Sequence, residues 1–131
     1  MDSRTSFDTI QVYFVESLPR QLGDMAEDIR VLQSHSTDKH RQAALAHLKD
    51  SAFAITSAAE PLGLRLIAQR ARSLLLFLNT LPPRKGVFES DEVLALTRAF
   101  NRLLIVARVE TADGEDRTSS THPTPPAAPE D

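Results

Sequence analysis

The chain has 131 residues and a formal net charge of −3, and 41% of its residues are hydrophobic and 25% charged. This length and composition are typical of one globular domain with a sizeable core. Because there is no cysteine, disulfides and thiolate-ligated metal centres are excluded. The N-terminus leads into no apolar segment typical of a secretory signal, and the longest apolar run, residues 74–78, is too short to span a bilayer. We therefore expect a cytoplasmic protein that does not insert into a membrane.

The first patterned segment, residues 15–32, carries apolar residues three and four positions apart. This spacing places them on one face of a helix. Pro19 interrupts the pattern, and a proline inside a helix removes a backbone hydrogen bond and crowds the preceding turn. We therefore expect a short leading helix over about residues 5–17, followed by a longer one. The polar residues 34–38 then predict a loop, whose Ser, Thr and Asp side chains can cap the next helix.

Three further segments show the same apolar spacing, over residues 45–59, 64–81 and 93–107. The first two of these are separated by a proline and a glycine within residues 61–63, which disfavour a continuous helix. A second break, residues 82–86, contains two adjacent prolines and a glycine. The Ser-Asp-Glu sequence that begins at residue 90 is typical of a helix start, because acidic side chains favour the positive end of the helix dipole.

Four such segments with short connections predict an all-α fold. We expect an antiparallel up-and-down four-helix bundle with a short leading helix, occupying residues 1–108. Residues 109–131 hold six acidic residues and one basic residue, a net charge of −5, with four prolines and no large apolar residue after Val109. Such a segment cannot bury enough apolar surface to offset its loss of conformational entropy. We therefore expect residues 109–131 to be a disordered acidic tail.

The second helix carries the most informative motif, residues 45–52, with the sequence Leu-Ala-His-Leu-Lys-Asp-Ser-Ala. It resembles the signature of histidine-containing phosphotransfer (Hpt) domains, roughly His-x-Leu-Lys-Gly-Ser-Ala. The residues that agree with the signature are Leu48, Lys49, Ser51 and Ala52. Ala46 then stands in the place of the phosphorylated histidine, and Asp50 stands in the place of the glycine. The resemblance extends over about residues 6–108 and includes the segment 13–22.

The resemblance implies a helical bundle that meets a receiver domain of a bacterial two-component system on its second helix. There Leu48 is expected in the core and Ala46, about 160° away around the helix axis, on the exposed face. Alanine has no nucleophile, and Asp50 adds negative charge where a phosphoryl group would approach. We therefore expect the protein to bind a receiver domain or a histidine kinase without relaying phosphate. The expected contact residues are Ala46, His47, Lys49 and Asp50.

Two alternatives remain open. In the first, the protein is an active relay, and its phosphoacceptor is His47, which lies about 100° around the helix from Ala46. In the second, the protein is a helical scaffold or a secretion-type chaperone, and its likeness to the Hpt signature has no functional meaning.

Other classes of function receive little support from the sequence. The nucleophile motifs, glycine-rich phosphate loops and paired carboxylates of ordinary enzymes are missing, so neither catalysis nor a cofactor is expected. The spacings of His35, His40 and His47 do not place two imidazoles on one helical face, so no metal site is expected. A few paired arginines without an aromatic-rich basic patch do not predict nucleic-acid binding.

Overall fold

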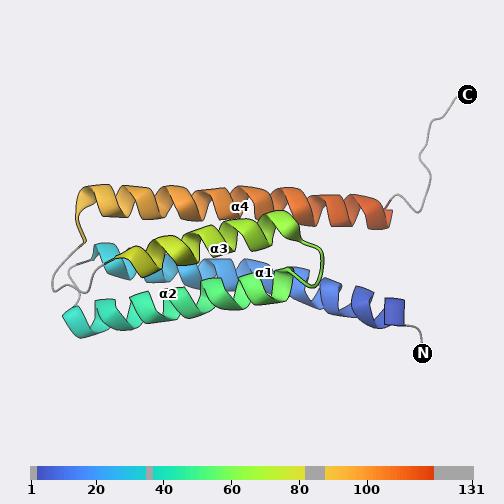
Figure 1. Ribbon diagram of the computed structural model, residues 1–131, viewed down its shortest axis with the longest axis horizontal. Coiled ribbons are helices and arrows are strands. Elements are labelled where there is room, and N and C mark those ends of the chain that lie inside the picture. The colour runs from blue at the N-terminus through green and yellow to red at the C-terminus, as the bar shows by residue number, and fades with distance from the viewer. Residues whose placement is uncertain (1–2, 35–36, 82–87, 120–131) are drawn as a thin grey trace, which may run out of the picture.

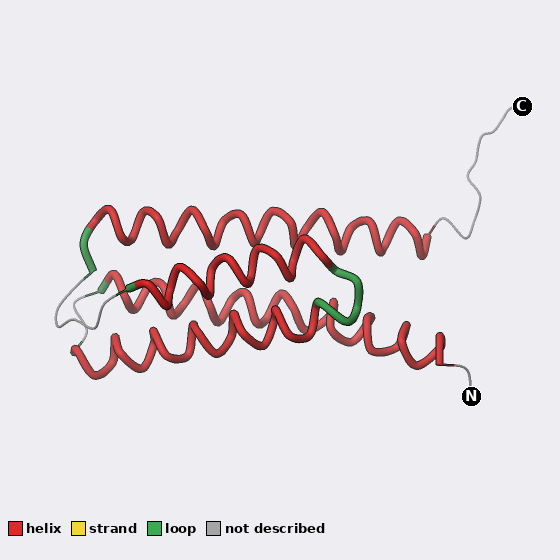
Figure 2. Tube along the Cα trace, in the orientation of Figure 1, coloured by secondary structure: helices red, strands yellow, loops and turns green. Residues whose placement is uncertain are grey.

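The structure is a computed structural model that describes residues 3–34, 37–81 and 88–119. Every regular element in these ranges is a helix: α1 (Ser3–Gln33), α2 (Asp38–Ala59), α3 (Arg65–Thr80) and α4 (Ser90–Ser119). Successive helices run antiparallel and pack side by side, as the colour gradient of Figure 1 shows. Figure 2, coloured by element type, shows helices joined by loops and no strand among the described residues. The predicted all-α, up-and-down four-helix bundle is therefore confirmed.

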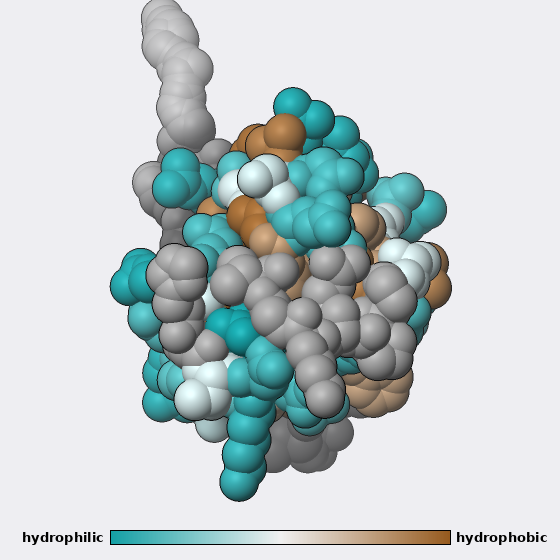
Figure 3. All heavy atoms as spheres, turned by 90° about the vertical axis from the view of Figure 1, so that its left-hand side faces the viewer, coloured by the Kyte–Doolittle hydropathy of each residue, from teal (hydrophilic) through white to brown (hydrophobic). Residues whose placement is uncertain are grey.

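One cluster of apolar side chains from all four helices forms the core. Its large, fully buried members lie seven residues apart within each helix, with one spacing of four, as the alternating three-and-four pattern of the sequence predicts: Leu18, Met25, Leu32, Leu48, Ile55, Ile67, Leu74, Leu78, Leu96 and Leu103. Burying a side chain of this size contributes about 1.5–3 kcal/mol. The apolar faces of the helices therefore supply most of the stabilisation. Seen from the end of the bundle where α4 begins, apolar residues appear as patches among hydrophilic ones (Figure 3).

The helix boundaries have local causes. α2 begins after Thr37, whose hydroxyl oxygen accepts a hydrogen bond from the His40 backbone N–H at 3.1 Å. This satisfies one of the amides that the first turn leaves unpaired. Between α2 and α3, Gly63 has a φ of +77°, which only glycine adopts without strain. α4 begins at Ser90, as predicted.

The expected separate leading helix is wrong. α1 is continuous from Ser3 to Gln33, with Pro19 inside it. The proline ring is exposed, while Leu18 and Leu22 on either side of it are buried in the same core. Packing on both sides of Pro19 thus holds the helix together although one backbone hydrogen bond is lost there.

α4 continues past the boundary predicted after residue 108, so residues 109–119 are helical rather than disordered. Glu110 explains part of this difference. Its carboxylate accepts hydrogen bonds from the backbone N–H groups of Leu66 (2.9 Å) and Ile67 (2.8 Å). It thereby caps α3, whose own N-cap residue, Leu64, makes no side-chain cap. The remainder of the predicted tail, residues 120–131, lies outside the described residues.

Candidate functional site

The motif on α2 lies across the boundary between core and surface. Leu48 is fully buried, as expected, and Ala46 and Asp50 are exposed. Lys49 is half-buried. It lies about 200° around the helix from His47, and therefore on the opposite flank of α2. Ala46, His47 and Asp50 thus share an open surface, whereas Lys49 lies at its edge.

His47 pairs with α1 rather than with another residue of its own helix. Its Nδ1 atom lies 2.6 Å from Oδ2 of Asp28. The His47 side chain is 57% exposed and that of Asp28 only 16%. The sequence did not indicate this pair, because the two residues are nineteen positions apart and on different helices.

The surroundings of His47 are acidic. The hydrogen bond with the Asp28 carboxylate, together with its charge, raises the pKa of His47 above its ordinary value. The charges of Asp24 and Asp50 act in the same direction, and partial burial opposes them. A phosphoryl group brought to this surface would meet these three carboxylates, and like charges repel.

The pairing also decides which ring nitrogen is available. Because Nδ1 of His47 is engaged with Asp28, Nε2 is the nitrogen left for other partners. A neutral imidazole whose Nδ1–H is held by a carboxylate has a nucleophilic Nε2, whereas an imidazolium has no lone pair to offer. The raised pKa favours the imidazolium form.

Phe53 is a surface residue that sequence reasoning missed. Its side chain is 61% exposed, although it belongs to a helix with a well-formed buried face. It lies seven residues after Ala46, so the two residues share one side of α2. Aromatic residues are enriched at protein interfaces. The sequence could have indicated this exposed residue, because Phe53 is an aromatic residue that does not follow the spacing of the core positions.

Arg41 was also missed, but its role is structural. It is buried at the start of α2, where it donates to the Ser34 carbonyl oxygen at 3.1 Å and pairs with Asp38. It thereby ties the end of α1 to the start of α2. Arg41 lies seven residues before Leu48, where the spacing of the core residues predicts an apolar side chain.

The remaining sequence candidates do not gather at one place. His40 is exposed, and His35 lies outside the described residues. Arg72 pairs with Glu60. In the parts of the chain that the structure describes, no three potential ligands cluster as a metal site. No helix among them combines the length and apolar character needed to cross a bilayer.

Comparisons with protein-family models, with curated proteins and with solved structures find no match to this chain.

Proposed function

We propose that this chain is an Hpt-like binding module of a bacterial two-component system. It acts in the cytoplasm as an adaptor, not as an enzyme. It contacts a receiver domain or a histidine kinase through the exposed side of α2 and does not relay phosphate itself. The contact surface comprises Ala46, His47, Lys49 and Asp50, to which the geometry adds Phe53.

The observation that carries this proposal is the exposure of Ala46, which stands at the position of the phosphorylated histidine in the Hpt signature. Leu48 is in the core and the position two residues earlier is open to solvent. That open position holds a methyl group, which cannot accept a phosphoryl group. The exposed aromatic ring of Phe53 on the same side offers a partner apolar contact area.

A phosphotransfer assay tests the absence of relay. The unmodified protein is expected to take no label from kinases and receivers that phosphorylate an Hpt domain. The double variant Ala46→His, Asp50→Gly supplies the nucleophile and removes one repelling carboxylate, so it is expected to gain acid-labile label. Labelling of the unmodified protein would contradict the proposal.

A binding assay with a panel of receiver and kinase domains tests the surface itself. Phe53→Ser is expected to weaken binding at least tenfold, because truncating an aromatic residue at the centre of an interface typically costs about 2 kcal/mol or more. Leu76→Ser is the matched control, since Leu76 is exposed to a similar extent on α3. If neither the unmodified protein nor the double variant binds any domain of the panel, the alternative of an unrelated scaffold or chaperone is favoured.

One observation favours the alternative of an active relay. The contact between His47 Nδ1 and Asp28 leaves Nε2 available on a largely exposed ring. In that case the unmodified protein carries acid-labile phosphate, and His47→Gln abolishes it. Asp28→Asn is the second variant, because it keeps a hydrogen-bonding side chain while removing the charge that favours the imidazolium.

A further inference from the structure

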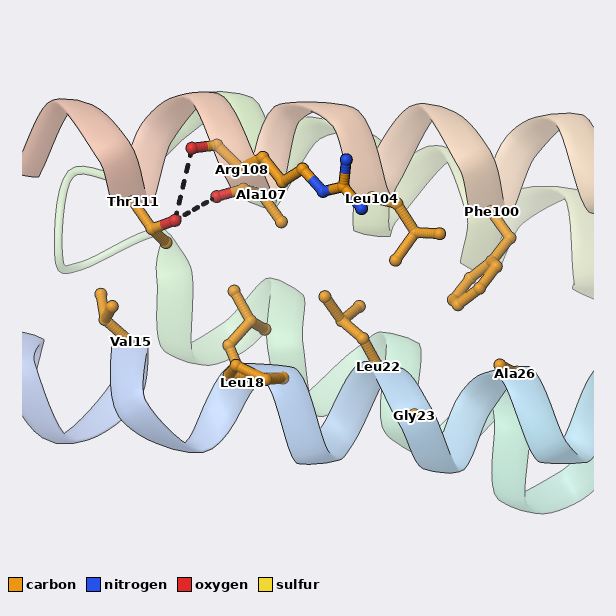
Figure 4. A pocket seen from close by; sticks show the side chains of 11 residues that line it. Val15, Leu18, Leu22, Gly23, Ala26, Phe100, Leu104, Ala107, Arg108 and Thr111 are labelled. Atoms are coloured by element: carbon orange, nitrogen blue, oxygen red, sulfur yellow. Dashed lines mark hydrogen bonds between the residues drawn. The ribbon is translucent and has the colours of Figure 1, made fainter.

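A groove runs between α1 and α4, the first and last helices of the bundle. Its cavity has a volume of about 370 Å³, within the range of small-molecule sites. Figure 4 shows side chains of the two helices pointing toward each other across the open space. Its walls are formed largely by Val15, Pro19, Gly23 and Ala26 of α1 and by Phe100 and Leu104 of α4.

The groove is elongated along the helix axes. A second cavity of about 190 Å³ shares Ala26 and Phe100 with the first and reaches Gln33 and Thr97. At 1.5 Å per helical residue, the first cavity covers about 16 Å of α1 between Val15 and Ala26. This length is close to the half-thickness of a bilayer's hydrocarbon core, about 15 Å, which one acyl chain spans.

The groove is too narrow for a helix. Leu18, Leu22 and Phe100 line it, and yet each is less than 10% exposed. A helix with its side chains is about 10 Å or more across, and a gap of that width would leave these three side chains open to water. An unbranched hydrocarbon chain is slender enough to enter without separating α1 from α4 further.

The wall on α1 contains two residues that weaken a helix. Pro19 removes a backbone hydrogen bond, and Gly23, one turn later, has a lower helix propensity than any residue except proline. A Cβ atom added to Gly23 would meet nothing within 4 Å, so close packing does not require glycine there. Both residues line the groove. Neither Pro19 nor Gly23 places a long side chain in the groove, so the space between the leucines of α1 stays open.

The groove also has a cationic group at its edge. Arg108 lines it, and its side chain extends along α4 toward Leu104 (Figure 4). Among the described residues, Arg108 makes no ion pair. A guanidinium binds a carboxylate through two parallel hydrogen bonds. The occupant that suits the groove is therefore apolar along its length and anionic at one end.

We propose that the groove between α1 and α4 binds a long-chain fatty acid. The hydrocarbon chain lies along Pro19, Gly23 and Ala26 on one side and Phe100 and Leu104 on the other. The carboxylate pairs with the guanidinium of Arg108. This site is separate from the surface of α2 described above and does not depend on its function.

Calorimetric titration of the full chain with palmitate, myristate and laurate tests the apolar part of the site. Each step to the shorter acid removes two methylenes and is expected to weaken binding about tenfold, because each buried methylene contributes about 0.8 kcal/mol. 1-Hexadecanol, which lacks the charge, is expected to bind about twofold to fivefold more weakly than palmitate. In Arg108→Gln that difference between acid and alcohol should disappear. Equal affinity for the three acids, or an unchanged preference for the acid in Arg108→Gln, would overturn the proposal.

Ala26→Leu tests the position of the site, because its larger side chain fills the middle of the groove. It is expected to reduce palmitate affinity at least tenfold. Ala54→Leu, on the exposed side of α2, is the matched control and should bind as the unmodified protein does. Circular dichroism verifies that both variants are folded. Unchanged binding by Ala26→Leu contradicts the proposal. So does sedimentation that shows a dimer dissociated by Ala26→Leu, because the groove's occupant would then be a second copy of the chain.

Discussion

The two flanks of α1 differ, although they belong to one helix. Toward α2, α1 packs closely, and the pair of Asp28 and His47 joins the two helices at the surface. Toward α4, α1 makes few contacts, and Leu22 faces Leu104 across the open groove (Figure 4). A short connection holds α1 beside α2, whereas no loop joins the first helix to the last. The side chains between α1 and α4 therefore influence how closely these two helices pack, and the α1 side of the groove contains the small residues Gly23 and Ala26.

Truncating leucines at the two flanks should show the largest difference. Leu48→Ala is expected to destabilise the protein by about 2–5 kcal/mol, because it leaves a cavity in a fully buried site. Leu74→Ala in α3 should cost a similar amount. Leu104→Ala, at the groove, should cost only about 1 kcal/mol, since its side chain is already partly exposed. Urea unfolding measures all three variants. If Leu48→Ala and Leu104→Ala lowered the free energy of unfolding equally, the groove would have to be closed in solution.

Removal of the Glu110 side chain should have the next largest effect. Glu110→Ala is expected to cost about 1–2 kcal/mol, because two amides at the start of α3 lose a charged acceptor. Glu16→Ala, an exposed acidic position on α1, should change the free energy of unfolding by less than about 0.5 kcal/mol. A chain shortened to end before residue 110 should therefore melt at a lower temperature than the full chain. Identical unfolding curves for Glu110→Ala and the unmodified protein would exclude the cap.

Gly23→Ala should stabilise the protein by about 0.5–1 kcal/mol, because alanine has the higher helix propensity and its methyl group meets no neighbour. Gly63→Ala makes the same chemical change where φ is +77°, and it should be destabilising. Thermal unfolding distinguishes the two. A loss of stability in Gly23→Ala would show that α4 approaches α1 more closely than the groove allows.

The smallest effect on stability is expected from the pair of Asp28 and His47, which joins α1 to α2. Because the pKa of His47 is raised in the folded protein, the pair stabilises the fold fully below the ordinary histidine pKa of about 6.5. This contribution is lost as the pH rises through the raised value. Since His47 is largely exposed, the contribution is about 0.5 kcal/mol or less. The stability difference between the unmodified protein and His47→Gln should thus be larger at pH 5 than at pH 9, as urea unfolding at both values can measure.

The sequence predicted what depends on spacing along one helix. The burial of Leu48, the exposure of Ala46 and the start of α4 at Ser90 all follow from local periodicity and capping. It did not predict the continuity of α1 through Pro19, because that continuity depends on packing against the other helices. The resemblance to the Hpt signature stays a prediction.

Contacts between residues far apart in the sequence could not be predicted for the same reason. The pair of Asp28 with His47 and the cap that Glu110 provides to Leu66 join residues that meet only after the helices have packed. No local pattern marks an acidic residue as the partner of a histidine or an amide on another helix. The groove was likewise not visible in the sequence, since it arises from the separation of the first and last helices.

The cap from Glu110 has a consequence for hydrogen exchange. The amides of Leu66 and Ile67 lie at the start of α3, where an amide normally exchanges freely because no carbonyl precedes it in the helix. Here their protection depends on a carboxylate that lies 44 and 43 residues further along the chain, respectively. They exchange only when this part of α4 moves away from α3 or the carboxylate turns aside. The exchange rates of these two amides should therefore report the local opening of α4, even while the centre of the bundle stays folded.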